Sequence, residues 1–388
     1  MTVGVSFLGY PRPRGVPGIR NHVAILSVMD NVNPVTRGIA HNVAGTLPIT
    51  MLFGRGQYGY DREVTYRTLA GLGANPNIAA VLVVGLESTS ADEVVARLEE
   101  SGKPCDCIVV AEMGGTIRAL EEGTRKAQRL VIEASRLRRR EYPLSQLRMG
   151  LECGGSDTTS GLAANPLMGR VADTLIDHGG TAIISETWEF VGAEHLFAER
   201  AQDPDVKREF LDRIRSAEHN ALSRGLDVRG TNPSPDNIRG GLSTIEEKSL
   251  GAMAKAGSRP LVGVLDYGEP PHLSGLHYMD TPAAAVESMT GLSAGGCQVL
   301  LFATGVGNTI DCTTTPTIKI TANRNTAVAL ADNIDFDASA LLDSQEVRMD
   351  AMADQLLEFV ADVASGTLTK GEVLKQQELA ISRFQPST

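Results

Sequence analysis

Short apolar runs alternate along the chain with longer segments whose apolar residues recur at helical spacing. In the first part, the short runs predict strands at 22–28, 50–53, 79–85 and 107–110, and the longer segments predict helices at 36–44, 62–71, 91–101 and 115–140. Strands and helices that alternate in this way are typical of a parallel sheet with helices on both faces.

The second part of the chain repeats this pattern. It predicts strands at 147–152, 181–185, 261–265, 298–303 and 316–320, with helices at 167–178, 203–224 and 282–294. We therefore expect an α/β protein with two Rossmann-like parallel-sheet subdomains and helices on both faces of each sheet. The expected parts are a first subdomain with an irregular N-terminal arm, a second subdomain and a C-terminal helical tail, at 1–145, 146–345 and 346–388.

Composition narrows the class of protein. The 388 residues carry a net charge of -11, which argues against an extended surface for nucleic acid. No run approaches the roughly 20 apolar residues that cross a bilayer, and the start MTVGVSFLGYPRPRG lacks the order of a secretory signal. We expect a cytoplasmic protein without a membrane or nucleic-acid partner. The five cysteines form no CxxC pair, and their odd number argues against a disulfide framework.

Chemically active side chains concentrate between residues 151 and 200. The glycines at 154 and 155 interrupt a strand, and two glutamates directly follow the apolar run 181–185. Ligands of open α/β sheets bind at the carboxyl ends of strands, so this stretch is the first candidate for a site. Its candidate residues are Cys153, Ser156, Asp157, Asn165, Glu186 and Glu189. A buried apolar role for the cysteine and helix capping for the asparagine remain open.

Other polar candidates lie at the ends of predicted elements, and they are Arg20, Asn21, His22, Arg55, Lys319 and Asn323. For the first three, a solvated arm is the alternative, and for Arg55 it is an ordinary cation on a surface loop. The chain has no GxGxxG that opens a helix, no P-loop, no HExxH and no GxSxG elbow. Nucleotide cofactors and serine-hydrolase chemistry therefore have no support.

Longer motifs point to a family. The segment CGGSDTTSGLAANPLMGRVAD, followed by GGTAIISETWEFVGAEHLFAERA, resembles the signature of the altronate/galactarate dehydratase family. Further blocks agree in order: GIRNH, NPNIAAVLVVG, NPSPDNIRGGLSTIEEKSLG, YMDTPAAAVESMTGLSAGGCQVLLFATG and PTIKITAN. The resemblance spans about residues 9–342. It implies a lyase that takes a proton next to a carboxylate and expels a group from the β carbon.

The resemblance also implies roles for the candidate residues. Such a reaction needs a base close to the carbon acid and positive charge against the enediolate that forms. We expect the catalytic residues to be His22, Asp157 and Glu186. A divalent cation, Fe²⁺ by resemblance, is expected on Cys153, Glu186 and Glu189. The expected substrate-binding residues are Arg20, Asn21, Arg55, Ser156, Asn165, Lys319 and Asn323.

One departure from the family pattern bears on the substrate. In that pattern the first three strands end in cysteines, which suit a soft metal or an iron–sulfur cluster, and here Asn31, Arg55 and Ser88 stand instead. Arg55 adds a planar cationic fork that grips oxyanions, which favours a substrate with a second anionic group. With the pattern GRG-Q-G-DRE, the chain resembles the sulfo-lyase branch of the family, which converts (2R)-3-sulfolactate into pyruvate and sulfite.

Two other functions stay open. One is a hydro-lyase that acts on altronate, galactarate or a related sugar acid, and the missing thiols count against it. The other is a non-catalytic subunit of a lyase complex. Many family members carry a fused small domain that has no counterpart in this sequence. The resemblance therefore implies a separate small subunit of the SAF type, an oligomeric assembly and a dianionic hydroxy acid as the small-molecule partner.

Overall fold

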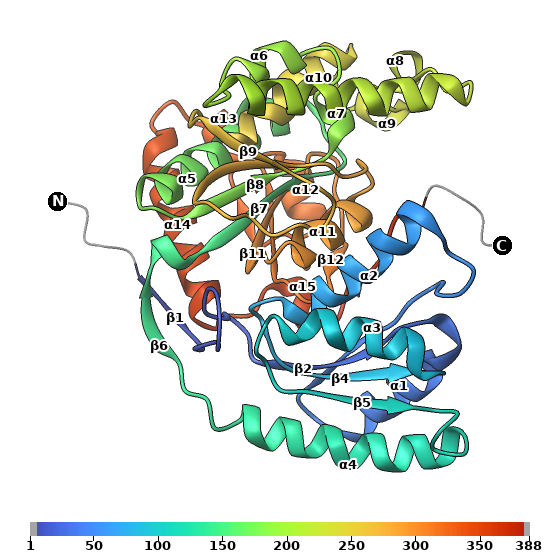
Figure 1. Ribbon diagram of the computed structural model, residues 1–388. Coiled ribbons are helices and arrows are strands. Elements are labelled where there is room, and N and C mark those ends of the chain that lie inside the picture. The colour runs from blue at the N-terminus through green and yellow to red at the C-terminus, as the bar shows by residue number, and fades with distance from the viewer. Residues whose placement is uncertain (1–5, 384–388) are drawn as a thin grey trace.

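The computed structural model describes residues 6–383, and two parallel sheets organise it (Figure 1). The smaller sheet has the strand order β3-β2-β4-β5. Its strands are β2 (His22–Ser27), β3 (Thr46–Ile49), β4 (Ile78–Gly85) and β5 (Cys105–Val109). Helices α1 (Asn33–Asn42) and α4 (Thr116–Ala134) pack together on one face, and α2 (Gly59–Ala74) and α3 (Ser88–Glu99) on the other. All of β4 is buried because helices cover both sides of the sheet.

Strand β3 lies four residues before the predicted position. The sequence predicted a strand at 50–53, but residues 46–49 pair with β2. Pro48 is tolerated there because β3 is an edge strand, where a missing N–H breaks no hydrogen bond of the ladder. Leu52 and Phe53, which suggested the strand, are exposed in the loop that follows.

The larger sheet has seven parallel strands in the order β14-β13-β11-β7-β8-β10-β9. They are β7 (Arg148–Cys153), β8 (Thr181–Ile184), β9 (Leu261–Leu265), β10 (Gly275–Met279), β11 (Val299–Ala303), β13 (Thr317–Thr321) and β14 (Phe336–Asp337). Helices α5 (Asn165–Asp177) and α14 (Met349–Ser365) pack on one face, and α11 (Ala285–Ala294) packs on the other. Two sheets wound with helices confirm the predicted α/β class.

A group of helices stands over the larger sheet (Figure 1). It contains α6 (Glu194–Ala198), α7 (Pro204–Ser223), α8 (Val228–Thr231), α9 (Pro235–Arg239) and α10 (Ile245–Met253), followed by the 3₁₀ turn η5 (Ala254–Ala256). The turn η5 packs tightly on α5. A Cβ atom at Gly169 would lie 2.2 Å from the carbonyl oxygen of Ala254, so only glycine allows this approach. The contact fixes η5 beside the ends of β7 and β8.

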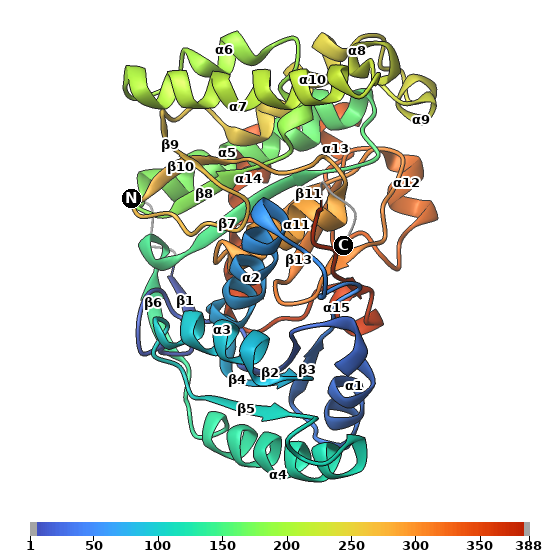
Figure 2. The ribbon, with the colours of Figure 1, turned by 45° about the vertical axis from the view of Figure 1, so that its right-hand side comes forward.

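Short elements complete the chain. Strand β1 (Ser6–Gly9) pairs antiparallel with β6 (Arg140–Pro143), and β12 (Asp311–Cys312) pairs with β15 (Gln377–Glu378). The remaining helices and turns are η1 (Asp30–Val32), η2 (Leu144–Gln146), the π-helical turn η3 (Ser160–Ala164), η4 (Thr187–Glu189), α12 (Arg324–Ala329), α13 (Ala340–Asp343) and α15 (Lys370–Leu374). Figure 2 shows the helical group and the smaller sheet at opposite ends of the molecule.

Two asparagines of the turn between α2 and β4 join the sheets. The side-chain amide of Asn75 donates to the carbonyl oxygens of Ser293 and Cys297, at 2.7 and 2.9 Å. The amide of Asn77 donates to those of Gln298 and Thr314, at 2.9 and 3.0 Å. Both asparagines are buried, so these bonds replace water that the folded chain has excluded.

Candidate active site

The candidate site lies at the carboxyl ends of β7 and β8. Glu152 and Cys153 are consecutive at the end of β7, so their side chains point to opposite faces of the sheet. Glu186 follows β8 with φ at 69°, in the left-handed region, which costs a non-glycine residue roughly 1–3 kcal/mol. The backbone N–H of Glu186 donates a hydrogen bond to the hydroxyl of Thr281 at 2.8 Å. Strain of this kind, held by surrounding contacts, is common at functional sites.

A buried lysine from η5 completes this cluster. The ammonium group of Lys255 contacts the carboxylate of Glu186 and lies 3.0 Å from the Sγ atom of Cys153. Neither side chain of the ion pair is more than 1% exposed. The same Glu186 oxygen accepts a hydrogen bond from the backbone N–H of Cys153 at 3.0 Å. The cation thus sits between the thiol and the carboxylate.

Burial sets the protonation of the cluster. It raises the pKa of the Cys153 thiol, and the charge of Glu186 raises that pKa further. Burial and the charge of Glu186 also raise the pKa of Glu152 well above its usual value. Burial opposes the charged form of Lys255, but Cys153, Glu186 and Glu152 together raise its pKa. Burial raises the pKa of Glu186 as well, against the effect of Lys255. At neutral pH we therefore take Cys153 and Glu152 as neutral and Glu186 with Lys255 as a charged pair.

A second lysine holds the other glutamate of the turn. The Nζ atom of Lys248 lies 3.0 Å from Oε1 of Glu189 and donates to Oδ1 of Asn232 at 2.8 Å. Oε2 of Glu189 is buried and has no hydrogen-bond partner within residues 6–383. The carboxylate of Glu186 instead shares a side-chain hydrogen bond with the neutral carboxyl group of Glu152.

A cavity of about 310 Å³ opens beside the second lysine. Ser156, Asp157, Asn165 and Lys248 are among its lining residues, so it brings together three of the predicted residues. The amide of Asn165 donates to the carbonyl of Gly251 at 2.9 Å, while its buried oxygen has no partner in the described chain. Small-molecule cavities are roughly 300–1,000 Å³, so this one suits a small substrate.

Ser156, Asp157 and Asn323 shape the rim of the site. Oδ1 of Asp157 accepts hydrogen bonds from the Ser160 backbone N–H and the Thr159 hydroxyl, at 2.8 and 2.7 Å. Its Oδ2 accepts one from the amide of Asn323 at 2.8 Å. The carbonyl of Ser156 accepts one from Asn237 at 2.9 Å. These contacts hold loops together at the edge of the sheet.

The residues predicted near the N-terminal arm lie outside this cluster. The guanidinium group of Arg20 forms two hydrogen bonds with the carboxylate of Glu372, at 2.7 and 2.8 Å. The amide of Asn21 donates to the carbonyl of Ala134 at 2.9 Å. His22 begins β2, at the amino end of the strand, and burial lowers its pKa to about 4. Arg20 and Asn21 thus serve contacts that join the arm to other parts of the chain.

Lys319 is buried in the middle of a strand. It is 0% exposed, and its Nζ atom has no hydrogen-bond partner among the residues described. Burial raises the pKa of nearby Asp311 to about 6, and the charge of Lys319 opposes that rise. In the register of the sheet, Phe302 stands between Lys319 and Glu152. Two strand spacings, about 10 Å, therefore separate the backbones of these two charged residues.

Arg55 is exposed on the loop between β3 and α2. It makes no ion pair with any residue between 6 and 383. Its guanidinium group is thus available, but the loop does not enter the cluster around Glu186. Sulfonate binding by this residue stays a prediction.

Each of the three predicted metal ligands contacts the ammonium group of a lysine. Lys255 lies against Cys153 and Glu186, and Lys248 lies against Glu189. No group of three or more His, Cys, Asp or Glu in residues 6–383 is arranged to hold an ion. As arranged, these donors do not fit a divalent cation, because ammonium groups occupy their free sides. The expectation of Fe²⁺ stays a prediction.

Three residues of the cluster, Glu152, Lys248 and Lys255, were not predicted from the sequence. The two lysines are seven residues apart in EEKSLGAMAKAG, which is close to two helical turns and puts them on one side of α10 and η5. That spacing was a signal for a shared surface. Nothing in the sequence showed that the surface would face Glu186, because the contact depends on how η5 packs against α5.

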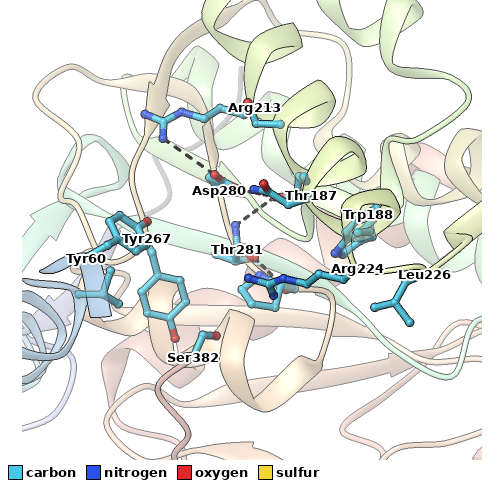
Figure 3. Close-up of a pocket in the computed structure, with 16 residues that line it drawn as sticks. Tyr60, Thr187, Trp188, Arg213, Arg224, Leu226, Tyr267, Asp280, Thr281 and Ser382 are labelled. Atoms are coloured by element: carbon cyan, nitrogen blue, oxygen red, sulfur yellow. Dashed lines mark hydrogen bonds and ion pairs between the residues drawn. The ribbon is translucent and has the colours of Figure 1, made fainter. Parts of the chain in front are cut away.

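A larger cavity, of about 560 Å³, lies against η4 (Figure 3). Thr187 and Trp188 of η4 line it, with residues of α2 and α7 and the turn after β10. The two cavities share no lining residue, and Glu186 and Glu189 are among the lining residues of neither.

Comparison with known proteins identifies the family. The family model "D-galactarate/Altronate dehydratase, C-terminal" matches residues 144–387, and "D-galactarate dehydratase/Altronate hydrolase, second domain" matches residues 9–135. The chain belongs to the galactarate/altronate dehydratase family. This confirms the resemblance found in the sequence.

Individual relatives narrow the chemistry. The chain is 39% identical to (2R)-sulfolactate sulfo-lyase subunit beta of Chromohalobacter salexigens, over 99% of both chains. It is 33% identical to altronate dehydratase of Bacillus subtilis, over 97% of this chain and 77% of the relative. It is also 33% identical to galactarate dehydratase (L-threo-forming) of Escherichia coli, over 78% of this chain and 59% of the relative. These relatives are lyases, and the chain is a lyase of this family. No helix within residues 6–383 is long and apolar enough to cross a membrane.

Proposed function

We propose that the chain is the large subunit of a lyase that converts (2R)-3-sulfolactate into pyruvate and sulfite. The observation that carries this proposal is the 39% identity to the sulfo-lyase subunit along 99% of both chains. The altronate dehydratase of B. subtilis is less similar and extends beyond the matched region, since the match covers 77% of it.

The reaction is a β-elimination. A base removes the proton from C2, the C2–C3 double bond forms, and the C3–S bond breaks with its electron pair leaving on sulfite. The product is the enol of pyruvate, which becomes pyruvate when C3 takes a proton from solvent. The substrate carries a carboxylate and a sulfonate, so the site must place positive charge against both groups.

We assign proton removal to Glu186. Its carboxylate is ionised beside Lys255 and is hydrogen-bonded to the neutral carboxyl group of Glu152. The strained backbone at this position supports a functional role. Lys255 does not contact the substrate in this scheme, and it keeps Glu186 charged and oriented.

Substrate binding falls to the smaller cavity. Lys248 lines it and supplies an ammonium group for the carboxylate of the substrate. The free oxygen of Asn165 accepts a hydrogen bond from the 2-hydroxyl group. Arg55 remains our candidate for the sulfonate, although it is not among the residues that line this cavity.

A separate small subunit completes the proposed enzyme. The sulfo-lyase relative is itself named as subunit beta. We therefore propose that this chain works with a second, smaller chain in the cytoplasm. A second candidate reaction is dehydration of a sugar acid, because altronate and galactarate dehydratases are also relatives.

The test is a panel of substrates given to the chain co-expressed with its small subunit. Sulfite and pyruvate released from 3-sulfolactate, with no 2-keto-3-deoxy acid from altronate or galactarate, would support the sulfo-lyase. The reverse result would make the protein a hydro-lyase. Inactivity on all three acids, with both subunits folded, would favour the non-catalytic alternative.

A further inference from the structure

The larger cavity lies between the two halves of the molecule. Tyr60 and Val64 line it from α2 of the smaller sheet, and the other lining residues belong chiefly to α7 and to loops of the larger sheet. Its volume of about 560 Å³ is in the range of cavities that bind small organic molecules. None of the residues predicted for the substrate lines it.

Helix α7 gives the cavity a polar stripe with room beside it. Residues at spacings of three and four lie on one face of a helix, and the stripe contains Arg213, Ser216, Ala217, Asn220 and Ala221 of α7, followed by Arg224 directly after the end of the helix. The small side chains in its middle leave the space next to the helix open. An arginine stands at each end.

The two arginines differ in their partners. Arg213 forms an ion pair with Asp266 at 2.7 Å and lies 4.0 Å from Asp280. Arg224 forms no ion pair with a residue between 6 and 383, and Figure 3 shows its side chain extending toward Thr281. A free positive charge therefore lies in a cavity where the other arginine is already neutralised.

Apolar side chains line the cavity beside Arg224, which is itself exposed. Trp188, Leu226 and Ala221 line the cavity with it, and Tyr267 forms part of the buried floor. A planar or apolar body can lie against these side chains while an anionic end reaches Arg224. This combination fits an organic carboxylate better than a neutral ligand or an inorganic ion.

Two residues that line the cavity, Thr187 and Thr281, also help to fix the backbone of Glu186, the candidate base. The backbone N–H of Thr187 donates to the carbonyl of Thr281 at 3.0 Å, and the hydroxyl of Thr281 accepts from the N–H of Glu186 at 2.8 Å. The Thr187 hydroxyl in turn donates to Asp280 at 2.6 Å. A ligand on this floor touches the segment that fixes the backbone of Glu186.

We propose that the cavity between α2 and α7 binds a small organic carboxylate with an apolar body, at a site separate from the cavity around Asn165. Its occupancy changes how Glu186 is held. Only this last effect rests on the proposed function, and binding itself does not.

The chain provides its own reporter for the test, because Trp188 is its single tryptophan and lines the cavity. The probe is 3-phenylpropionate, titrated into the full-length chain while Trp188 fluorescence is followed. The neutral 3-phenylpropan-1-ol has the same body without the charge. Arg224→Gln removes the free cation, and Arg215→Gln is the matched control, since Arg215 lies on the same helix, 70% exposed and outside this cavity.

We expect a saturable fluorescence change with 3-phenylpropionate and at least tenfold weaker binding of the alcohol. Arg224→Gln should weaken binding of the acid by at least tenfold, and Arg215→Gln should leave it unchanged. No saturable change, or equal affinity in wild type and Arg224→Gln, would overturn the proposal. Displacement of the probe by 3-sulfolactate would overturn the claim of a separate site. Sulfite release is measured independently, so its failure would leave a positive binding result intact.

Discussion

At the scale of single residues, the lysine between Cys153 and Glu186 is the strongest departure from what the sequence suggested. The sequence pointed to the thiol and the carboxylate, and spacing alone could not reveal which cation would face them. Contact between Lys255 and Glu186 depends on packing between segments that lie 69 residues apart in the chain. A candidate site can thus be located from motifs, while the partners of its charges need the folded structure.

Removing that lysine should destabilise the fold strongly. Lys255→Met leaves Glu186 buried without its counter-charge, and breaking a buried pair in this way costs about 3–5 kcal/mol. Urea unfolding measures the loss. The double variant Lys255→Met with Glu186→Gln should recover a large part of it, because no unpaired charge remains. As a control, Lys207→Met breaks an exposed pair with Glu199 and should change stability by less than about 1 kcal/mol. Equal losses in the single and double variants would contradict a paired charge.

His22 should make the fold sensitive to acid. Burial lowers its pKa from 6.5 to about 4, so the unfolded chain takes up a proton at a higher pH than the folded chain does. Its contribution is complete above pH 6.5 and is lost as the pH falls toward 4. This lowering of the pKa corresponds to about 3 kcal/mol. Unfolding of His22→Gln, measured from pH 7 to pH 4, should show a shallower decline than wild type. A parallel decline in both proteins would refute this account.

At the scale of elements, most strands and helices follow from periodicity. The predicted helix at 203–224 corresponds to α7, and the buried run at 79–85 corresponds to β4. Strand β3 was misplaced because apolar residues 51–53 looked more like a strand than a segment containing Pro48. Strands of only two to four residues, such as β12 and β15, are too short to show an alternation of apolar and polar residues. They can be recognised only once the strand with which they pair is known.

Close packing between α5 and η5 should be needed to place Lys255. In Gly169→Ala, the new methyl group would lie 2.2 Å from the Ala254 carbonyl oxygen and 2.8 Å from the Gly257 nitrogen. Overpacking of this kind costs about 1–3 kcal/mol. We expect lower thermal stability together with reduced lyase activity, because η5 must move. Arg170→Ala, next to it on α5 but exposed, is the control and should change neither property appreciably. An unchanged melting temperature for Gly169→Ala would contradict the tight contact.

At the scale of the whole molecule, the asparagines between the sheets should make the two halves unfold together. Asn75→Ala removes one donor from each of the carbonyls of Ser293 and Cys297, which keep hydrogen bonds from the Gly296 N–H and the Thr315 hydroxyl, so we expect a cost of about 1 kcal/mol for each lost bond. Calorimetry should show a broader or divided transition for this variant and a sharper one for wild type. Identical transitions would show that other contacts couple the halves.

The central claim is that Glu186 accepts the proton in a β-elimination. The most direct test is sulfite release from 3-sulfolactate by wild type and Glu186→Gln, each with the small subunit. Glu199→Gln, an exposed glutamate paired with Lys207, is the matched control. We expect the Glu186 variant to be less stable than wild type, because Lys255 loses its partner, but to fold and to lose at least about a hundredfold in kcat, while the control keeps its rate. Sulfite release by folded Glu186→Gln at the wild-type rate would contradict the account.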